Sequence, residues 1–447
     1  MNWHPLKSFA FGSLVGVTAL ALAAGCSSST TTETKDEASP AVETDTVVVE
    51  ADKPVDAPES SFEPPVFEAS AEKLLASRLP IERTTEGWVR LFDGHTLFGW
   101  VIGGKANWHV EDQAIVADDG ENCLLATSTV WSDYELELQF QCEDETNSGV
   151  FVRTTLDPQS VQTDCYEVNI APASNPFPTG GIVQRDKGKL FETDAGTWHT
   201  MNILCDGPML TVTIDGEVTC ELDDADTPLS GFIGLQHRKG RVAFKDIQIR
   251  PLGLQNLLAD GLDRWTIREG MDGEYRIDDE GQLVVDGGKQ QLESKDQFGN
   301  FVMLADYKMD DPKSNSGLFF RAIPGDEMMG YECQVSNETI DGNPLQPADC
   351  GAGGIFRRQD ARVVAGEPKR WNSILLVAEG NHFATWVNGV QVTDVVDTRD
   401  ADENPRRGLR LEPGTIIVQG HDKTTQATYR QISIASFDDG VNASDDQ

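Results

Sequence analysis

The sequence has few basic residues for its length. Of its 447 residues, 36 are Lys or Arg and 74 are Asp or Glu, which gives a formal net charge of -38. Proteins that bind nucleic acids hold the phosphate backbone through clustered Lys and Arg, so this balance excludes a nucleic-acid partner. The hydrophobic content of 39% is high enough to build cores and excludes a wholly disordered chain. The length predicts two or three domains.

The sequence also lacks a membrane-spanning run and the common metal and phosphate motifs. The apolar run of residues 9–24 is shorter than the roughly 20 residues that a spanning helix needs. No cluster of Cys and His has zinc spacing, and no Gly-rich motif follows a strand and opens a helix. No cofactor is therefore evident. Acidic turns at 223–226 and 400–403 leave a divalent metal possible, although solvated turns are the simpler interpretation.

The N-terminus is typical of a secretory leader. Lys7 provides a positive charge before the apolar run, and the small residues 23–25 lead directly into Cys26. This segment resembles the lipobox of bacterial lipoproteins, although Ala23 stands where those sequences prefer Leu. The resemblance implies a lipidated Cys26, contact with a membrane through this anchor, and a place in the cell envelope, at the periplasmic face or the cell surface. The alternative is an ordinary secretory leader with an unmodified cysteine.

Acidic, polar segments flank the rest of the chain. Residues 27–84 are rich in Ser, Thr, Glu, Asp and Pro and predict a disordered tether, with one short amphipathic helix over 69–79. Residues 438–447 form an acidic tail.

An internal repeat sets the domain organisation. The segment NSGVFVR at 147–153 recurs as NSGLFFR at 315–321, and a YE dipeptide and a GGI tripeptide follow each copy in the same order. Self-similarity at this scale is the signature of a duplicated unit. The sequence therefore predicts two homologous domains, at 85–252 and 253–437.

The local pattern predicts β-structure in both halves. Segments such as YELELQF and LTVTI alternate apolar and polar residues with period two, and short turns separate them. The VNGV segment at 387–390 predicts a hairpin with a type I′ turn, because Asn-Gly tolerates positive φ at both central positions. No long segment has a helical period. The predicted fold class is all-β, with two tandem jelly-roll β-sandwiches after the tether.

Each half resembles the 3-keto-disaccharide hydrolase domain family, once catalogued as a domain of unknown function, whose fold is a concanavalin A-like jelly roll. The resemblance rests on the openings LFDGHTLFGW and NLLADGLDRW, the central SGxFxR followed by YE, and the closing IGLQH and VQGHD. It implies an enzyme that cleaves glycosides whose sugar has first been oxidised at C3. Such a substrate implies an upstream sugar 3-dehydrogenase. The alternative is a non-catalytic tandem carbohydrate-binding protein of the cell envelope.

Cleavage of a 3-keto glycoside makes specific chemical demands. A ketone at C3 acidifies the C2 proton, and the glycosidic oxygen on C1 lies β to the carbonyl. Elimination needs a base at C2 and a cation or hydrogen-bond donor at the enolate oxygen, and hydration of the enone then completes a net hydrolysis.

The repeated residues supply candidates for these roles. The Arg would hold the enolate or the sugar, the Glu would act as base, and the His would be an acid or base or a metal ligand. A structural Arg–Glu pair and a surface histidine are the alternatives. The catalytic candidates are Arg153, Glu167 and His237 in the first half and Arg321, Glu332 and His421 in the second. The substrate-binding candidates are Tyr166, Asn169 and Gln236 in the first half and Tyr331, Gln334 and Gln419 in the second.

Differences between the halves favour the second as the active one, because it keeps the QGHD motif and has Gln334 where the first half has Asn169. The i, i+2 pair Glu135 and Glu137 is predicted to lie on a solvated strand face, since the aligned positions in the second half are apolar. Among the seven cysteines after Cys26, residues 333 and 350 are the best candidates for a disulfide.

Overall fold

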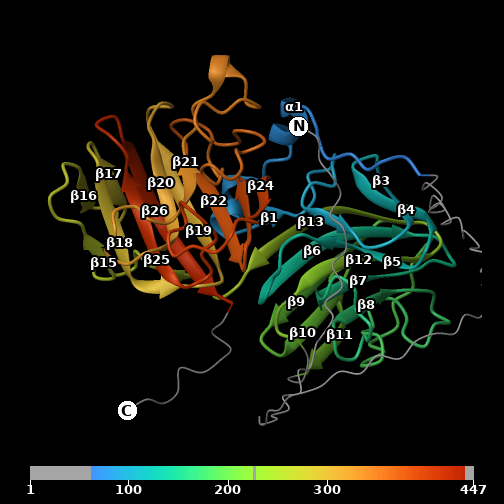
Figure 1. Ribbon diagram of the computed structural model, residues 1–447. Coiled ribbons are helices and arrows are strands. Elements are labelled where there is room, and N and C mark those ends of the chain that lie inside the picture. Colours follow the sequence, from blue (N-terminus) through green and yellow to red (C-terminus); the bar gives the residue numbers. More distant parts are fainter. Residues whose placement is uncertain (1–61, 225–227, 438–447) are drawn as a thin grey trace, which may run out of the picture. The chain divides into compact units, whose positions relative to one another are not determined.

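The computed structural model of the chain describes residues 62–224 and 228–437. These residues form four antiparallel sheets arranged as two sandwiches, which confirms the predicted fold class (Figure 1). The leader with Cys26, the tether up to residue 61 and the acidic tail lie outside the described residues. No helix within the described ranges is long and apolar enough to cross a membrane.

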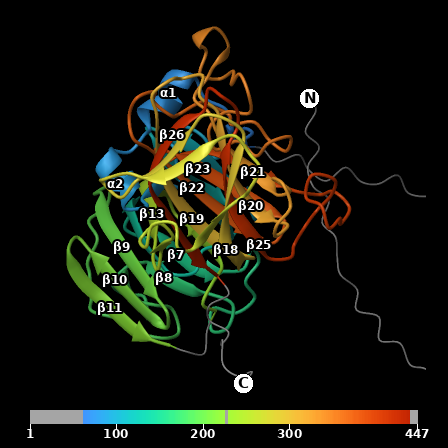
Figure 2. The same ribbon diagram turned by 90° about the vertical axis from the view of Figure 1, so that its left-hand side faces the viewer.

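The first sandwich packs an eight-stranded sheet against a five-stranded sheet. Its strands are β1 Val89–Arg90, β2 Trp100–Ile102, β3 Ala106–Glu111, β4 Ala114–Gly120, β5 Cys123–Thr127, β6 Tyr134–Cys142, β7 Asn147–Thr154, β8 Tyr166–Ile170, β9 His199–Asp206, β10 Met209–Ile214, β11 Glu217–Asp223, β12 Phe232–Lys239 and β13 Val242–Pro251. The larger sheet has the order β11-β10-β9-β6-β13-β4-β3, with β1 beside β13, and the smaller has the order β2-β5-β12-β7-β8. Strands β9, β10 and β11 lie side by side at one edge (Figure 2).

The second sandwich repeats this topology. Its strands are β14 Gln255–Asn256, β15 Trp265–Ile267, β16 Glu274–Ile277, β17 Leu283–Asp286, β18 Gln290–Phe298, β19 Phe301–Met309, β20 Ser316–Ala322, β21 Tyr331–Val335, β22 Asn372–Glu379, β23 His382–Val387, β24 Val390–Val396, β25 Gly414–Gly420 and β26 Gln426–Ser436. The larger sheet has the order β16-β17-β26-β19-β22-β23-β24, with β14 beside β26, and the smaller has the order β15-β18-β25-β20-β21.

Period-two alternation builds the cores. In β6 every second residue from Tyr134 onward is buried in the core of the first sandwich, and the intervening residues point outward. Glu135 and Glu137 lie on this outer face, partly exposed, and pair with Arg250 and Arg83 respectively. The predicted solvated face is therefore present, with ion pairs along it.

The aligned strand β19 is buried on both faces. Alternate residues enter the core of the second sandwich, whereas Val302 and Leu304 belong to the apolar cluster of the first. Polar contacts accompany this packing: Arg362 Nη2 donates to Asp93 Oδ2 at 3.0 Å, with both side chains largely buried. Val302 and Leu304 are apolar where β6 has glutamates because they are covered.

One tight turn and two bulges shape the strand ends. Asn388 and Gly389 both have positive φ, so the hairpin between β23 and β24 has the predicted type I′ geometry. Arg153 and Arg321 also have positive φ, of 51° and 45°, where the strand pairing shifts register opposite them. A bulge of this kind reverses the face to which the following side chain points.

Two short helices precede the first strand. They are α1 Ala71–Ala76 and α2 Ile81–Thr85. Leu74 of α1 is buried in the core of the second sandwich. The short helix near 69–79 is thus confirmed. Residues 62–84 of the predicted tether are ordered, because side chains such as Leu74 are buried, so the disordered assignment does not hold for this part. A single 3₁₀ turn, η1 Ile340–Gly342, lies in the loop after β21.

The described cysteines, which include every cysteine after Cys26, are free and buried. The pairing suggested for Cys333 and Cys350 is therefore absent from the structure. Burial raises the pKa of the Cys333 thiol to about 12, so these residues act as small apolar side chains.

Candidate functional site

The candidate site lies on the outer face of the five-stranded sheet of the second sandwich. Strand pairing aligns Gln334 of β21 with Gly317 of β20, and Gln419 of β25 with Gln291 of β18. The next row along the same face contains Glu332, which pairs with Phe319. The period of two in these strands therefore brings Glu332, Gln334 and Gln419 to one surface.

A glycine makes room for the polar side chains above it. A methyl group at Gly317 would lie 2.9 Å from Glu332 Oε1 and 3.1 Å from Gln419 Oε1. Both distances are shorter than ordinary van der Waals contact, so the carboxylate and the amide occupy the space over this residue. A glycine inside a strand often marks such a close approach, and here it lets two functional groups converge.

Glu332 is held as a weak acid. Burial is the main cause that raises the pKa of its carboxyl from 4.5 to about 7, and the nearby cations Arg406, His421 and Arg357 oppose this increase. The Asp349 carboxylate adds to the increase. A carboxyl with a pKa near 7 exchanges its proton readily at neutral pH and is well matched to general-base catalysis.

Two buried amide oxygens on this face have no hydrogen-bond partner among the described residues: Gln334 Oε1 and Gln419 Oε1. Their side chains are fixed through the nitrogen. Gln334 Nε2 donates to Asn315 Oδ1 at 2.9 Å and to Asp349 Oδ2 at 3.2 Å. Gln419 Nε2 lies 3.5 Å from the Met328 sulfur. Buried polar atoms normally have partners, so two orphaned acceptors on one face indicate a place for a ligand or for water.

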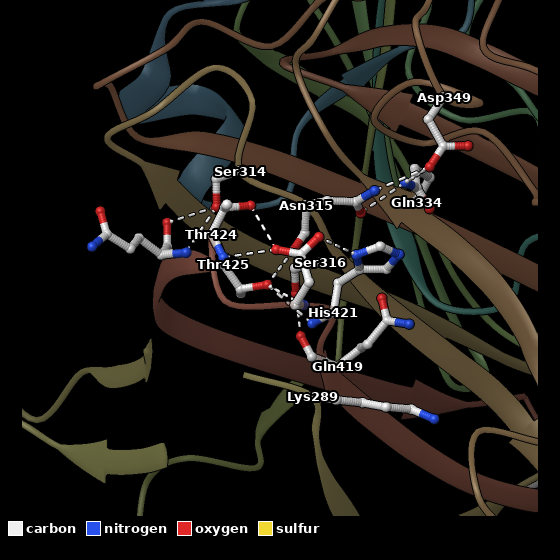
Figure 3. Close-up of polar contacts among 12 residues, drawn as sticks. Lys289, Ser314, Asn315, Ser316, Gln334, Asp349, Gln419, His421, Thr424 and Thr425 are labelled. Atoms are coloured by element: carbon white, nitrogen blue, oxygen red, sulfur yellow. Dashed lines mark hydrogen bonds and ion pairs between the residues drawn. The ribbon is translucent and has the colours of Figure 1, made fainter. Parts of the chain in front are cut away.

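His421 directly follows β25 and lies next to this network. Its Nδ1 is 2.9 Å from Asp422 Oδ2, and its side chain is about 42% exposed. Figure 3 shows Gln334, Gln419 and His421 on the same side of the sheet. A carboxylate on one ring nitrogen orients the imidazole and leaves Nε2 to exchange a proton with a ligand.

Arg406 is the cation nearest to Glu332, and sequence reasoning did not find it. Its Nη2 lies 3.7 Å from Glu332 Oε2, its Nε donates to the Met328 carbonyl at 2.9 Å, and its guanidinium lies over the Phe319 ring. The residue belongs to the loop between β24 and β25, and its approach to the sheet is a long-range contact that no local pattern reveals.

The predicted catalytic arginines are placed elsewhere. The bulge turns Arg321 to the core side, where its side chain is fully buried and donates to the carbonyls of Gly299 and Arg410. Arg153 donates to the Ser132 and Gly207 carbonyls and pairs with Asp133 at 2.8 Å. The expected placement of each Arg at the sugar is wrong, because the bulge changes the alternation and turns the side chain to the core side. Neither Arg pairs with the repeated Glu, and both hold loops together.

Three more candidates point into the cores. Tyr331 stacks on Phe320, and its hydroxyl donates to Asp397 Oδ2 at 2.8 Å. Tyr166 lies in the core of the first sandwich. His237 pairs with the core residue Cys123 and is 3% exposed, with Nδ1 3.3 Å from the Glu121 carbonyl. The prediction that Tyr331, Tyr166 and His237 contact the substrate is therefore wrong. Each of them is adjacent in its strand to a residue of the outer face and so points the other way.

The first sandwich repeats the arrangement with changes. Gln236, Gly149 and Asn169 form one row, and Glu167 pairs with Phe151 in the next. Burial raises the pKa of Glu167 to about 7, and the Arg238 guanidinium opposes this increase. Arg238 thus takes the place that His421 holds in the second sandwich.

The described residues of the two sandwiches form no evident metal centre. Within the described ranges no group of three or more His, Cys, Asp or Glu side chains is arranged to hold an ion. A cavity of about 230 Å³ lies instead on the eight-stranded sheet of the first sandwich, beside Trp198. Lys245 Nζ sits 4.0 Å above this ring, so the ring face is occupied and is not free to stack on a sugar.

A comparison with protein families identifies the class of this protein. The family described as 3-keto-alpha-glucoside-1,2-lyase-like domain matches residues 87–250 and 254–435. The two matches together cover well over half of the chain, one in each sandwich. The protein therefore belongs to this family and is carbohydrate-active. A comparison with curated proteins finds no match.

The comparison with solved structures finds proteins from bacteria. A candidate glycosyl hydrolase from Parabacteroides distasonis ATCC 8503 is 18% identical, with a TM-score of 0.35 over 39% of this chain and 99% of its own. A second from the same organism is 26% identical, with a TM-score of 0.33 over 37% and 99%. The carbohydrate-binding module CBM66 from Bacillus subtilis is 13% identical, with a TM-score of 0.28 over 34% and 95%.

Proposed function

We propose that the second sandwich cleaves the glycosidic bond of a sugar that carries a ketone at C3, by elimination and hydration. The observation that carries this proposal is Glu332, a carboxyl with a pKa of about 7 beside the cation of Arg406 and over the gap left by Gly317. A base next to a fixed cation suits removal of a proton α to a ketone, since the cation stabilises the enolate. The description of the family, a 3-keto-alpha-glucoside-1,2-lyase-like domain, supports the same chemistry.

The reaction begins at C2. The Glu332 carboxylate removes the C2 proton, and the electron pair of the C–H bond forms a C2–C3 double bond, which leaves the negative charge on the C3 oxygen beside Arg406. The enolate then re-forms the ketone, the C1–C2 double bond forms, and the C1–O bond breaks. Protonated His421 gives its proton to the departing oxygen.

Hydration completes the cycle. Neutral His421 takes a proton from water as the oxygen adds to C1, and protonated Glu332 returns a proton to C2. The products are the free 3-keto sugar and an alcohol, and both side chains regain their starting states. The amide oxygens of Gln334 and Gln419 accept hydrogen bonds from sugar hydroxyls and hold the ring against the sheet.

The test is turnover of a 3-keto disaccharide by the purified protein. Glu332→Gln should lower kcat by about 10²–10⁴-fold, the usual contribution of a general base, and should abolish exchange of the C2 proton with D₂O, measured by NMR. Gly317→Ala should reduce both kcat and the exchange of the C2 proton, because the added methyl group displaces the Glu332 carboxylate and the Gln419 amide. Glu145→Gln, at an exposed carboxylate, is the matched control.

The pH profile gives a second readout. Because Glu332 must be ionised to act as base, the acidic limb of the kcat/KM profile should rise with pH with a midpoint near 7. Wild-type turnover in Glu332→Gln, or a 3-keto disaccharide that the wild type binds without releasing either sugar, would contradict the proposal.

We further propose that Cys26 carries a lipid and holds the protein in the cell envelope, at the periplasmic face or the cell surface. The support is the sequence of residues 1–26 alone. An upstream enzyme that oxidises the C3 hydroxyl must supply the substrate, because the ketone is what makes the C2 proton acidic.

A further inference from the structure

We infer that the first sandwich contains a second saccharide site that binds sugar without cleaving it. This inference rests on the proposed function only in taking the second sandwich as the catalytic half. The site lies on the outer face of the five-stranded sheet β2-β5-β12-β7-β8, around Glu167, Asn169 and Gln236. It is the counterpart of the Glu332 face, as strand register shows.

The shape of the catalytic face is retained. A methyl group at Gly149 would lie 3.2 Å from Glu167 Cγ and 3.4 Å from its Oε1. Glu167 therefore extends over the glycine as Glu332 does over Gly317. The remainder of the floor is more apolar, because Leu124 occupies the position of Gln291.

Two buried acceptors indicate what the site binds. Asn169 and Gln236 are 3% and 5% exposed, and among the described residues neither Asn169 Oδ1 nor Gln236 Oε1 has a hydrogen-bond partner. Burying an amide oxygen without a donor is unfavourable, so these atoms are satisfied by a molecule that supplies donors. With the Glu167 carboxylate they make three acceptors on one face. A neutral saccharide, with several adjacent hydroxyl donors and no charge, matches this pattern.

The group that would transfer a proton to the leaving oxygen is replaced. Arg238 is the cation that acts on Glu167, where His421 acts on Glu332. A guanidinium stays protonated throughout the physiological range and cannot exchange a proton in a catalytic cycle. Gln184 also stands at the position of Arg357, as the aligned GGI segments show. The first sandwich therefore keeps the hydrogen-bond acceptors for a sugar but lacks the histidine that would protonate the leaving oxygen.

The test counts binding sites on the full chain. Isothermal titration of the Glu332→Gln protein with a 3-keto disaccharide should give two sites per chain. The double variant Glu332→Gln/Gln236→Leu should keep only the site of the second sandwich. The double variant Glu332→Gln/Gln419→Leu should keep only the site of the first sandwich. Circular dichroism checks folding, and Asn169→Leu serves where Gln236→Leu fails to fold. Loss of the amide acceptor should weaken the affected site by about tenfold or more.

Turnover separates this inference from the proposed function. Glu332→Gln leaves the first sandwich unchanged and should still lose turnover by the factor given above, because the first site does not cleave the sugar. The inference would be overturned if Glu332→Gln bound one sugar per chain and adding Gln236→Leu did not change that binding. It would also be overturned if Glu332→Gln still turned over the sugar and adding Glu167→Gln abolished that turnover. If the wild type binds two sugars and cleaves none, the proposed reaction fails while the second site stands.

Discussion

Ionising Glu332 should destabilise the folded protein, and the pH dependence of stability measures this effect. Burial raises the pKa of the carboxyl from 4.5 to about 7. Between these two values the folded protein keeps a proton that the unfolded chain has released. The unfolded state then binds fewer protons, so the free energy of unfolding falls as pH rises. The contribution is fully present below about 4.5 and is lost once the pH passes about 7.

The size of the effect follows from the two pKa values. A shift from 4.5 to about 7 corresponds to about 3 kcal/mol, at 1.36 kcal/mol for each pH unit. Glu332→Gln replaces the carboxyl with an amide that does not titrate, so the variant should lack this dependence. Between pH 4.5 and pH 8, the free energy of unfolding of the variant should therefore increase by about 3 kcal/mol relative to that of the wild type.

Urea denaturation at both pH values measures this double difference. Subtracting the wild-type change removes the contribution of every other group in the chain. Glu145→Gln, at an exposed carboxylate, should follow the wild type. Glu167→Gln should behave like Glu332→Gln, since burial also raises the pKa of Glu167 to about 7. If Glu332→Gln and wild type change in parallel, Glu332 is not a buried acid, and its assignment as the base loses its physical basis.

Two further predictions concern other parts of the chain. Arg321→Met should lower the free energy of unfolding by at least about 2 kcal/mol, because the buried guanidinium bonds to loop carbonyls and to Asn300 Oδ1; an unchanged urea midpoint would show that these bonds contribute nothing. Cys26→Ser should move the full chain from the membrane fraction of expressing cells to the soluble fraction, and equal partitioning of both proteins would refute lipid anchoring.

The sequence predicts the sheets well because their causes are local. Alternation of apolar and polar residues gives the strands, and the Asn388-Gly389 turn gives a hairpin with the expected positive φ values. The repeat gives two copies of one topology. Within the candidate site, alternation also places Glu332, Gln334 and Gln419 together correctly, since no irregularity interrupts β21 or this end of β25.

The failures arise where alternation breaks or where contacts are distant in sequence. A bulge at Arg321 moves its side chain to the core face, and nothing in SGLFFR announces that bulge. His237 adjoins a residue of the site and therefore faces the other way. Arg406 and Asp349 reach Glu332 from loops, and such positions depend on the packing of the whole sandwich. Gly317 is the one missed feature with a visible signal, because a glycine recurs at the same place inside both strands.

Duplication allows structural and functional residues to be separated within one chain. Both bulged arginines recur with equivalent contacts to loop carbonyls, to Ser132 and Gly207 in the first half and to Gly299 and Gly380 in the second, as expected of residues that every copy of the fold needs. The buried Glu and the amide acceptors also recur, which both catalysis and sugar binding require. The substitutions around the carboxylates, Arg238 for His421 and Gln184 for Arg357, occur on the substrate face and leave the cores intact. Under the proposed function, these differences on the outer face change what a bound sugar undergoes, whereas the shared acceptors keep it bound.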